Sequence, residues 1–453
     1  MNIGRLTGFA LARTFAVIFL TTLSSSDKLY SQELEPPRVL LEAAIAEGEM
    51  AGAVVMMAHR GETVYAVAVG DAQVQPTRRS MQLDTVFDLA SLTKPIGTAT
   101  SIMVLVDQGR VDVNTSVSNY WPAFGSAGKD AITIADLLLH RGGLIADNAL
   151  SDYTDDQQEN WKRISALRPI APPGERFVYS DVGFIVLGKV VEEVSGLPLN
   201  VFARQHIFEP LGMTETGYLP TDALKLRCAA SEQRDAEWLV GEVHDPRAAR
   251  LDGVAGHAGL FSTASDLIRF GNALATITAN SPSNDLFSVA TRNQMIAPHD
   301  VPRGERAFGW DIRSPYSSNR PTQFSSTAFG HGGFTGTVLW IDPEQELVFV
   351  FLSNRLHPDG QGNVNRLAAK VADAIIDEMK ILQPILECHK ISIPAKKFSK
   401  MSLNANPIAT DPSPKTVSAL EGVIPGNATT SAADDRSTTE STSTLRSSNQ
   451  PDA

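Results

Sequence analysis

Residues 90–96 of the chain are Ala-Ser-Leu-Thr-Lys-Pro-Ile, and an apolar run continues from there as far as residue 106. The length and apolar character of this run predict a helix. Ser91 and Lys94 are three residues apart, so their side chains would lie on one face of that helix. Pro95 is compatible with this position, because the first turn of a helix does not need its missing N–H. Since free N–H groups at a helix start favour negative charge, the stretch combines a hydroxyl, an amine and an electropositive backbone.

The pattern Ser-x-x-Lys is weak when taken alone, because it also occurs at Ser25 and Lys28. A second interpretation is that Ser91 only caps a helix and that Lys94 is solvated. We expect the helix to end at Gly109, a residue typical of helix C-termini. This helix has apolar residues on nearly all of its faces, which predicts that it is buried in the middle of the protein.

The remaining patterns predict an α+β fold, with an antiparallel β-sheet flanked by helices and an inserted all-helical lobe. Strands are expected at 53–58, 63–69, 337–341 and 347–352. Further helices are expected at 36–50, 132–139, 181–194, 199–207, 265–274 and 363–379. The sheet lobe would comprise about residues 36–90 and 300–392, and the helical lobe about residues 91–299. A site would lie where the two lobes meet.

Both ends of the chain differ from this 36–392 domain. Residues 1–31 combine two arginines with a short apolar run and small residues, which predicts an export signal rather than a membrane anchor. Residues 393–453 are rich in Ser, Thr, Asn, Pro and Asp, which predicts a disordered tail. We therefore expect a periplasmic or secreted protein without a transmembrane anchor.

The composition excludes several classes of function. With 43% hydrophobic and 20% charged residues the chain has an ordinary globular composition, and its net charge of −12 argues against nucleic acid as a partner. Cys228 and Cys388 have no metal-binding spacing and are expected to be unpaired thiols. No His-Glu-x-x-His motif or His/Cys cluster occurs in the sequence, so neither a metal nor another cofactor is expected.

Two later stretches add candidate site residues. Tyr179 lies at the junction between a short extended piece and the helix expected at 181–194, where a phenol can project into a cleft. His331 is followed by two glycines at the expected start of a strand, and glycines allow close backbone approach. The pattern His-x-Gly also occurs at His140 and His257, but these lie in loops beside helices, where we expect histidines that order the loops.

Together these motifs resemble those of the serine β-lactamase-related hydrolases. The matching residues are 91–94 (Ser-Leu-Thr-Lys), 179–181 (Tyr-Ser-Asp) and 331–333 (His-Gly-Gly). Connecting stretches at 137–144, 207–213 and 253–267 are similar as well, and the likeness covers about residues 36–378. The superfamily contains class C β-lactamases, D-Ala-D-Ala carboxypeptidases, D-aminopeptidases and β-lactamase-like carboxylesterases. Its fold, an antiparallel sheet with helices and a helical lobe, agrees with the outline above.

The resemblance implies a role for each motif. Ser91 would be the acylated nucleophile, and Lys94 would help to deprotonate it. Tyr179 would pass protons between the nucleophile and the leaving group. His331 and Gly333 would flank the substrate, and the backbone N–H groups of Ser91 and Phe334 would form the oxyanion hole. The sequence leaves open whether Lys94 or Tyr179 is the base.

Two departures from the class C pattern affect the expected substrate. Asp181 stands where those enzymes have Asn, and a carboxylate cannot donate a hydrogen bond to a substrate carbonyl. It could instead hold Lys94 charged, which opposes a role for Lys94 as the base. His331 and Gly332 stand where those enzymes have Lys and Thr, which removes a permanent cation and a hydroxyl.

We therefore expect an exported serine hydrolase for small ester, amide or peptide substrates, of esterase or D-amino-acyl/peptide hydrolase type, with substrates derived from the cell wall as one source. One alternative is a true β-lactamase or D-Ala-D-Ala carboxypeptidase. A further alternative is a non-catalytic, cell-wall-binding member of the fold. A Gly-x-Ser-x-Gly motif does not occur, so an α/β-hydrolase fold is disfavoured.

Overall fold

The computed structural model describes residues 35–275 and 286–390, with side chains described up to residue 380. Backbone contacts divide the chain into two units, residues 1–385 and 386–453, and the first of these is described below. The predicted signal peptide, the predicted tail and the Cys388 side chain lie outside the described residues. Cys228 is a buried free thiol.

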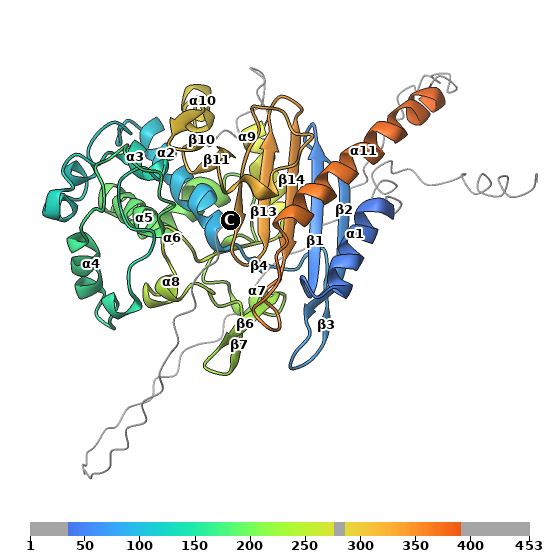
Figure 1. Cartoon of the computed structure of the whole chain (residues 1–453), viewed down its shortest axis with the longest axis horizontal. Helices are drawn as coiled ribbons and strands as arrows, with labels where there is room; N and C mark the ends of the chain where they lie inside the picture. The colour runs from blue at the N-terminus through green and yellow to red at the C-terminus, as the bar shows by residue number, and fades with distance from the viewer. Residues whose placement is uncertain (1–34, 276–285, 391–453) are drawn as a thin grey trace, which may run out of the picture. The chain divides into compact units, whose positions relative to one another are not determined.

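A nine-stranded antiparallel sheet forms one half of the first unit (Figure 1). From one edge to the other its strands are β3 (Arg79–Ser80), β2 (Glu62–Gln73), β1 (Gly52–His59), β14 (Leu347–Ser353), β13 (Thr337–Asp342), β12 (Phe329–Gly333), β11 (Trp310–Arg313), β10 (Gly304–Ala307) and β9 (His299–Val301). The two hairpins predicted at 53–69 and 337–352 are confirmed. They lie side by side because β1 pairs with β14, with Val54 opposite Leu352.

Alternate residues of the central strands face two different cores. On β1, Val54 and Met56 point into the larger core, whereas Val55 and Met57 point into the smaller one. This alternation follows from the two-residue period of a strand that is covered on both faces. α1 (Glu35–Ala46) and α11 (Asn365–Lys390) contribute to the smaller core, and α9 (Ala264–Ala275) to the larger one.

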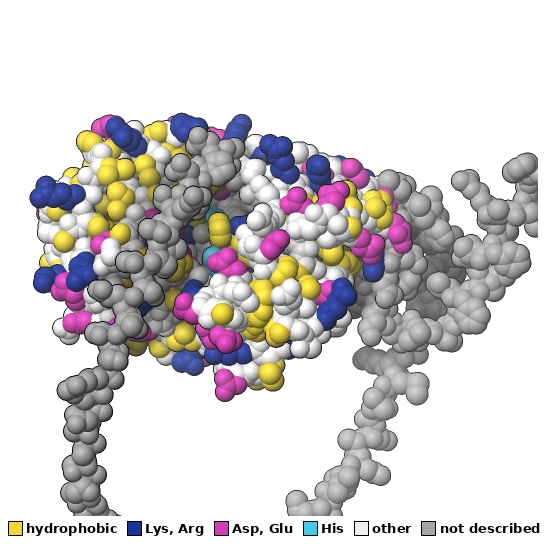
Figure 2. Space-filling view, turned by 60° about the horizontal axis from the view of Figure 1, so that its bottom comes forward, with side chains coloured by type: hydrophobic (Ala, Val, Ile, Leu, Met, Phe, Trp, Pro, Cys, Tyr) yellow, Lys and Arg dark blue, Asp and Glu magenta, His cyan; other side chains and the backbone are white. Residues whose placement is uncertain are grey.

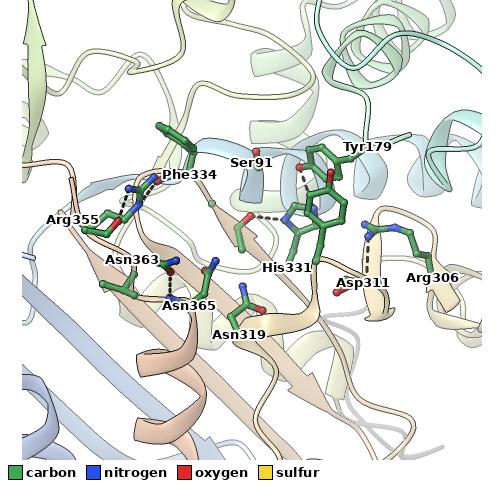
Figure 3. Close-up of a pocket in the computed structure, with 15 residues that line it drawn as sticks. Ser91, Tyr179, Arg306, Asp311, Asn319, His331, Phe334, Arg355, Asn363 and Asn365 are labelled. Atoms are coloured by element: carbon green, nitrogen blue, oxygen red, sulfur yellow. Dashed lines mark hydrogen bonds and ion pairs between the residues drawn. The ribbon is translucent and has the colours of Figure 1, made fainter. Parts of the chain in front are cut away.

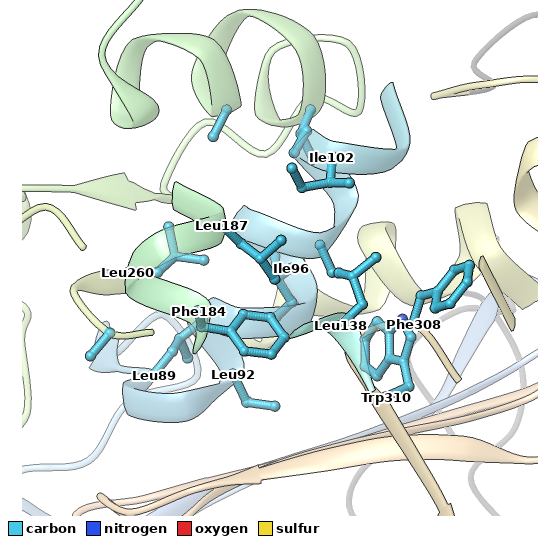
Figure 4. Close-up of a cluster of buried hydrophobic side chains, with 14 of the residues drawn as sticks. Leu89, Leu92, Ile96, Ile102, Leu138, Phe184, Leu187, Leu260, Phe308 and Trp310 are labelled. Carbon is cyan, nitrogen blue, oxygen red and sulfur yellow. The ribbon is translucent and has the colours of Figure 1, made fainter. Parts of the chain in front are cut away.

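The second half of the unit contains the helix that follows Ser91. Its apolar side chains, Ile96 among them, pack against α5 (Asp181–Ser195) and against Trp310 of the sheet (Figure 4). The remaining helices are α3 (Ile134–Leu138), α4 (Gln157–Ala166), α6 (Leu199–Ala203), α7 (Asp222–Lys225), α8 (Pro246–Arg250) and α10 (Val289–Ile296). Among the described residues no helix combines the length and apolar character needed to cross a membrane.

The inserted lobe is mainly but not entirely helical. Short strands within it or at its edge form a three-stranded sheet, β4 (Phe87–Asp88), β8 (Leu260–Ser262) and β5 (Gly217–Tyr218), and a hairpin, β6 (Ala230–Arg234) and β7 (Glu237–Val240). The expectation of a purely helical lobe was therefore wrong in this detail. Strands of two to five residues are too short to produce an alternating pattern that can be read in the sequence.

The predicted helix at Ser91 is three consecutive helical pieces. A 3₁₀ turn (Ala90–Leu92) is followed by a π-helix (Lys94–Ala99) and by α2 (Thr100–Asp107). The π pattern includes the Thr100 N–H, which bonds to the carbonyl of Pro95 five residues earlier. The predicted end is confirmed, since Gly109 has a φ of +68° directly after the last helical turn.

The position of His331 also differs from the prediction. It lies in the middle of the separate strand β12 and does not open the first strand of the late hairpin. The reason is a tight turn after Gly333, in which the Gly336 N–H bonds to the Gly333 carbonyl and Gly336 has a φ of +96°. The segment predicted as one strand is therefore two neighbouring strands.

Candidate active site

The turn that carries Ser91 is held in an uncommon conformation. Ala90, directly before it, has a φ of +45°, which is unfavourable for a residue with a Cβ. The Ala90 N–H donates to Asp88 Oδ1 at 2.8 Å, and the second oxygen of this buried carboxylate accepts from the His244 N–H at 2.6 Å. Strained backbone of this kind often occurs at functional sites, where the surrounding contacts hold it in place.

Lys94 lies behind the Ser91 hydroxyl and is fully buried. Its Nζ is 3.0 Å from Ser91 Oγ, 2.6 Å from Asp181 Oδ1 and 4.9 Å from the centre of the Tyr179 ring. Burial alone would lower the pKa of Lys94, but the negative charge of Asp181, which is also hydrogen-bonded to Lys94, helps to raise the pKa above its usual value. Lys94 is therefore a charged donor to Ser91 and not a free base.

Asp181 is the first residue of α5 and belongs to a small acidic cluster. Burial acts to raise its pKa, but Lys94 and His257 outweigh that effect and lower it. His257 Nε2 is 2.9 Å from Asp245 Oδ1, and ligand atoms of Asp181, Asp245 and His257 lie within 4.8 Å of one another. Such a set could hold a cation, and the Lys94 ammonium already supplies one to Asp181.

Tyr179 is fixed by two aromatic neighbours. His140 stacks on its ring at 4.4 Å, and Tyr316 stacks on it at 4.9 Å. His140 is held by its own hydrogen bond, because its Nδ1 accepts from the Ser180 N–H at 3.0 Å. The sequence interpretation of His140 as an ordering histidine fits this contact, whereas Tyr316 was not predicted.

His331 faces Tyr179 in a defined tautomer. Its Nδ1 lies 2.7 Å from the Gly332 carbonyl and must donate to it, so Nε2 of the neutral ring is an acceptor. This Nε2 is 3.4 Å from the Tyr179 hydroxyl. Burial, followed by the charges of Arg306 and Lys94, lowers the pKa of His331 well below its usual value. His331 is therefore neutral and can accept a hydrogen bond from Tyr179.

The glycines after His331 let β12 approach the Ser91 turn closely. A Cβ on Gly333 would lie 2.4 Å from the Leu89 carbonyl oxygen, and a Cβ on Gly332 would lie 2.4 Å from Asn319 Nδ2. Thr335 Oγ1 donates to the Asp88 carbonyl at 2.7 Å, which ties the two segments together. The close approach to the Leu89 backbone requires glycine at position 333, whereas a side chain at position 332 would have to displace the Asn319 amide.

A cavity of about 350 Å³ opens in front of Ser91 (Figure 3). Its walls are Ser91, Tyr179, Arg306, Asp311, Tyr316, Asn319, His331, Gly332, Gly333, Phe334, Arg355, Gly362, Asn363, Val364 and Asn365. Figure 2 shows a hollow on one face of the domain, with a histidine side chain visible in it.

Every predicted site residue lies in or next to this cavity. Ser91, Tyr179, His331, Gly333 and Phe334 line it, and Lys94 and Asp181 form an ion pair behind Ser91. The sequence analysis missed Arg306, Asp311, Tyr316, Asn319, Arg355 and the start of α11. The first four come from strands and a loop that had no recognisable pattern, and Arg355 and α11 gave no signal that linked them to the motifs.

Comparison with known proteins places the chain among enzymes. The family model described as "Beta-lactamase" matches residues 38–374. The chain is 34% identical to an N-acetylmuramyl-L-alanine amidase of Bacillus subtilis (strain 168), over 70% of this chain and 80% of that protein. It is 31% identical to a "Putative D-alanyl-D-alanine carboxypeptidase" of Escherichia coli (strain K12), over 62% of this chain and 72% of that protein.

Among solved structures, EstCE1, a hydrolase with promiscuous acyltransferase activity, has the same fold. The TM-score is 0.61 at 24% identity, and the likeness covers 75% of this chain and 97% of EstCE1. This similarity agrees with the arrangement of sheet and helical lobe described above. From the family match and the identity to the Bacillus amidase, we conclude that the chain belongs to the beta-lactamase family of serine hydrolases.

Proposed function

We propose that this protein hydrolyses small D-amino-acyl, peptide or ester substrates through an acyl-enzyme on Ser91. The observation that carries the proposal is the position of Ser91, whose Oγ is 3.0 Å from the Lys94 ammonium and which lines one cavity with Tyr179 and His331. A serine hydroxyl is a poor nucleophile unless neighbouring groups accept its proton and stabilise its developing charge. The cavity offers both functions.

In the first step Ser91 Oγ forms a bond to the carbonyl carbon of the substrate. Lys94 is protonated and donates to Oγ, so the departing proton passes to the Tyr179 oxygen. Tyr179 in turn releases its own hydrogen to the acceptor Nε2 of His331. The amide N–H groups of Ser91 and Phe334 would stabilise the oxyanion, a contribution of about 3 kcal/mol per donor.

In the second step the bond to the leaving group breaks. The proton transfers of the first step run in reverse: Tyr179 gives a proton to the leaving nitrogen or oxygen, and His331 returns a proton to Tyr179. Because the pKa of His331 lies well below its usual value, the imidazolium returns its proton readily. Water then repeats the two steps with Ser91 as the leaving group and releases the acid.

The proposed substrate class follows from the positions at which this sequence differs from the class C β-lactamase motifs. Neutral His331 replaces the lysine with which class C β-lactamases hold a β-lactam, so we infer that β-lactams are poor substrates. The relatives named amidase and carboxypeptidase favour amide bonds of cell-wall peptides as the source of substrate. A cell-wall substrate also fits the predicted export by residues 1–31 and a location outside the cytoplasm.

A labelling experiment tests the nucleophile. A fluorophosphonate probe should label the protein at Ser91, and Ser91→Ala should abolish both labelling and turnover. Ser265→Ala, which changes an exposed serine on α9, serves as the matched control and should label normally. Labelling that persists in Ser91→Ala would contradict the proposal.

Parallel assays separate the substrate classes. We expect turnover of a D-alanyl dipeptide, a muramoyl-L-alanyl peptide or a short-chain ester to exceed that of the β-lactam nitrocefin. Preference for nitrocefin would favour the alternative of a true β-lactamase. Absence of turnover with all four substrates, together with absence of labelling, would favour the non-catalytic alternative.

A further inference from the structure

His244 lies beside the Ser91 turn, although it is not one of the residues that line the cavity. Its ring stacks on the Phe334 ring, with 5.5 Å between the ring centres and 30° between the ring planes. Its backbone N–H donates to Asp88 Oδ2 at 2.6 Å, and the other oxygen of this carboxylate accepts from the Ala90 N–H at 2.8 Å. One residue is therefore joined to both segments that would supply the N–H groups for the oxyanion.

The Phe334 side chain depends on neighbouring side chains for its position. It lies directly after β12 and is 58% exposed, so the hydrophobic core does not hold it. Arg355 supports its backbone, because Arg355 Nε donates to the Phe334 carbonyl at 2.6 Å, and Figure 3 shows the two residues together beside Ser91. His244 supports the ring. Since the Phe334 N–H belongs to the same short segment, contacts that fix the residue also limit the direction of this N–H.

Glu232 on β6 holds the His244 imidazole in place. A hydrogen bond from His244 is the main reason why the pKa of Glu232 lies below its usual value, so the carboxyl group is ionised at neutral pH. An ionised carboxylate only accepts, so His244 Nε2 donates to Glu232 Oε1, and the two atoms are 2.6 Å apart. The His244 side chain is only 11% exposed, so its ring has little room to leave the Phe334 ring.

A histidine ring on a phenylalanine ring is not by itself a sign of function. His206 stacks on Phe202 at 4.4 Å in the helical lobe, and neither residue lines the cavity. The His244 ring differs because its partner, Phe334, is part of the cavity wall. The backbone contact of His244 to Asp88 adds a second link to the site, which the His206 pair lacks.

We propose that His244, held by Glu232, is a positioning residue for the oxyanion hole. Its ring keeps Phe334 in place and its backbone supports the Ser91 turn, so that both N–H groups are aimed at one oxygen. This inference rests on the proposed acyl-enzyme function and adds a residue that acts on the transition state without touching the substrate. Loss of the ring should weaken binding of a tetrahedral oxyanion and leave binding of a planar ketone nearly unchanged, because such donors are aimed at charge that develops in the transition state.

A matched pair of ketones, trifluoroacetophenone and acetophenone, tests this role. With the fluorinated ketone, Ser91 Oγ forms a bond to the carbonyl carbon, the π-electron pair of the C=O bond moves to its oxygen, and the serine proton passes to the Tyr179 oxygen. The adduct thus carries an oxyanion. Acetophenone lacks the electron-withdrawing fluorines and binds as the planar ketone. Calorimetry gives a dissociation constant for each ketone.

In His244→Ala we expect the dissociation constant of trifluoroacetophenone to rise about tenfold, less than the 10²–10³-fold effect of removing a whole oxyanion donor. The value for acetophenone should change by less than about twofold, and kcat/KM for p-nitrophenyl acetate should fall by about the same factor as the adduct is weakened. His244→Phe retains a stacked ring and should stay within about threefold of the wild type.

His206→Ala is the matched control, because it removes a histidine ring from a phenylalanine outside the cavity. Both dissociation constants should remain at their wild-type values in this variant. An equal rise of both constants in His244→Ala would overturn the proposal, since a purely structural role in the cavity wall has that effect. Unchanged constants in His244→Ala would overturn it as well.

A second variant covers the case in which His244→Ala does not fold. Glu232→Gln leaves the ring in place and removes the charge that holds it, at a side chain that is 40% exposed. We expect the dissociation constant of trifluoroacetophenone to rise about threefold while that of acetophenone is unchanged. Equal changes for the two ketones would overturn the proposal. Failure of the acyl-enzyme function has a different result, because Ser91→Ala would then bind trifluoroacetophenone as tightly as the wild type does.

Discussion

Two lysines of this protein, Lys94 and Lys129, are both fully buried but have opposite surroundings. Lys129 Nζ donates to three backbone carbonyls, those of Ser126 at 2.8 Å, Ser165 at 2.8 Å and Leu167 at 2.7 Å. Lys94 Nζ contacts only one backbone carbonyl, that of His257 at 3.3 Å, and its other partners are a carboxylate and a serine hydroxyl. Burial lowers the pKa of Lys129, whereas the pKa of Lys94 is raised because the negative charge of Asp181 opposes the effect of burial.

The difference shows what separates a structural buried lysine from one in a reactive site. Three neutral carbonyls use all three N–H bonds of Lys129 and hold the loop around residue 126 against the end of α4. Lys94 bridges a charged group and a nucleophile, so its charge influences the chemistry at Ser91. Substitutions of the two lysines should therefore have effects of different kinds.

The largest expected effect is on activity. Lys94→Met removes the charged donor to Ser91 Oγ, and we expect kcat/KM to fall by about 10³-fold, the effect of losing one positioned donor that stabilises developing negative charge. It also leaves Asp181 without its cation. The double variant Lys94→Met/Asp181→Asn removes that unpaired charge and should regain stability without regaining activity. Near-normal turnover in either variant would show that Lys94 is not part of the reaction.

The next effect is on stability. Lys129→Met leaves three carbonyls without their donor, and at about 1 kcal/mol each the free energy of unfolding should fall by about 3 kcal/mol. Activity per folded molecule should remain normal, because Lys129 lies outside the cavity lining. Denaturant unfolding and an active-site titration measure the two quantities separately. If Lys129→Met lowered kcat without lowering the free energy of unfolding, Lys129 would not be a purely structural lysine and the contrast with Lys94 would fail.

The pH dependence of stability should have opposite signs at the two lysines. The folded-state pKa of Lys94 is raised, so its contribution is present below the unfolded value of 10.5 and is lost at higher pH. The folded-state pKa of Lys129 is lowered, so the folded state binds fewer protons just below 10.5 and stability rises there with pH. Unfolding free energies of the wild type and both methionine variants, measured between about pH 9 and 11, should show these opposite slopes.

Asp181 should make stability depend on pH in the acid range, as the two lysines do in the alkaline range. Because its folded-state pKa is lowered, its contribution is present above the unfolded value of 3.8 and is lost as the pH falls through the folded value. Asp181→Asn should therefore flatten the loss of stability below about pH 4. Unfolding curves that remain parallel for the wild type and the variant in this range would contradict the charged Lys94–Asp181 pair.

The smallest effect is expected at an exposed lysine. Lys162 on α4 lies 3.3 Å from Glu159, and its side chain is 78% exposed. Solvent screens such a pair, so Lys162→Met should change the free energy of unfolding by no more than about 0.5 kcal/mol and leave turnover unchanged. A thermal melt and one activity assay are sufficient. A larger loss of unfolding free energy would mean that this exposed ion pair stabilises the fold as strongly as a buried lysine does, and would contradict the comparison.

The sequence predicted the parts of the site that depend on local spacing. Ser91 and Lys94 are three residues apart, and Tyr179 and Asp181 lie at the start of one helix. The local backbone therefore places Lys94 near Ser91 and Asp181 near Tyr179, whatever the rest of the fold. The central hairpins were predictable because their strands are runs of β-branched, aromatic and other apolar residues separated by short stretches of turn residues. The α+β fold class was also correct.

The parts that were missed depend on contacts between distant segments. Arg306 and Tyr316 lie in or after short strands near the edge of the sheet, and their place in the cavity depends on the pairing of β10 with β11 and of β11 with β12. The charge of Lys94 depends on its burial and on its distance to Asp181, which the sequence left open. Nothing in local spacing shows that a distant histidine ring will stack on Phe334.

The neighbouring positions of β1 and β14 have a consequence for how the chain assembles. Ala53 is paired with Ser353, 300 residues later, so the middle of the sheet joins the first strands of the domain to the last. At a synthesis rate of about 5–20 residues per second, the hairpin of β1 and β2 waits roughly 15–60 s before its partner strand exists. Until then the backbone N–H and C=O groups along one edge of β1 have no partner strand. Folding of the sheet lobe is therefore late and slow, because it depends on contacts between residues that are far apart in the chain.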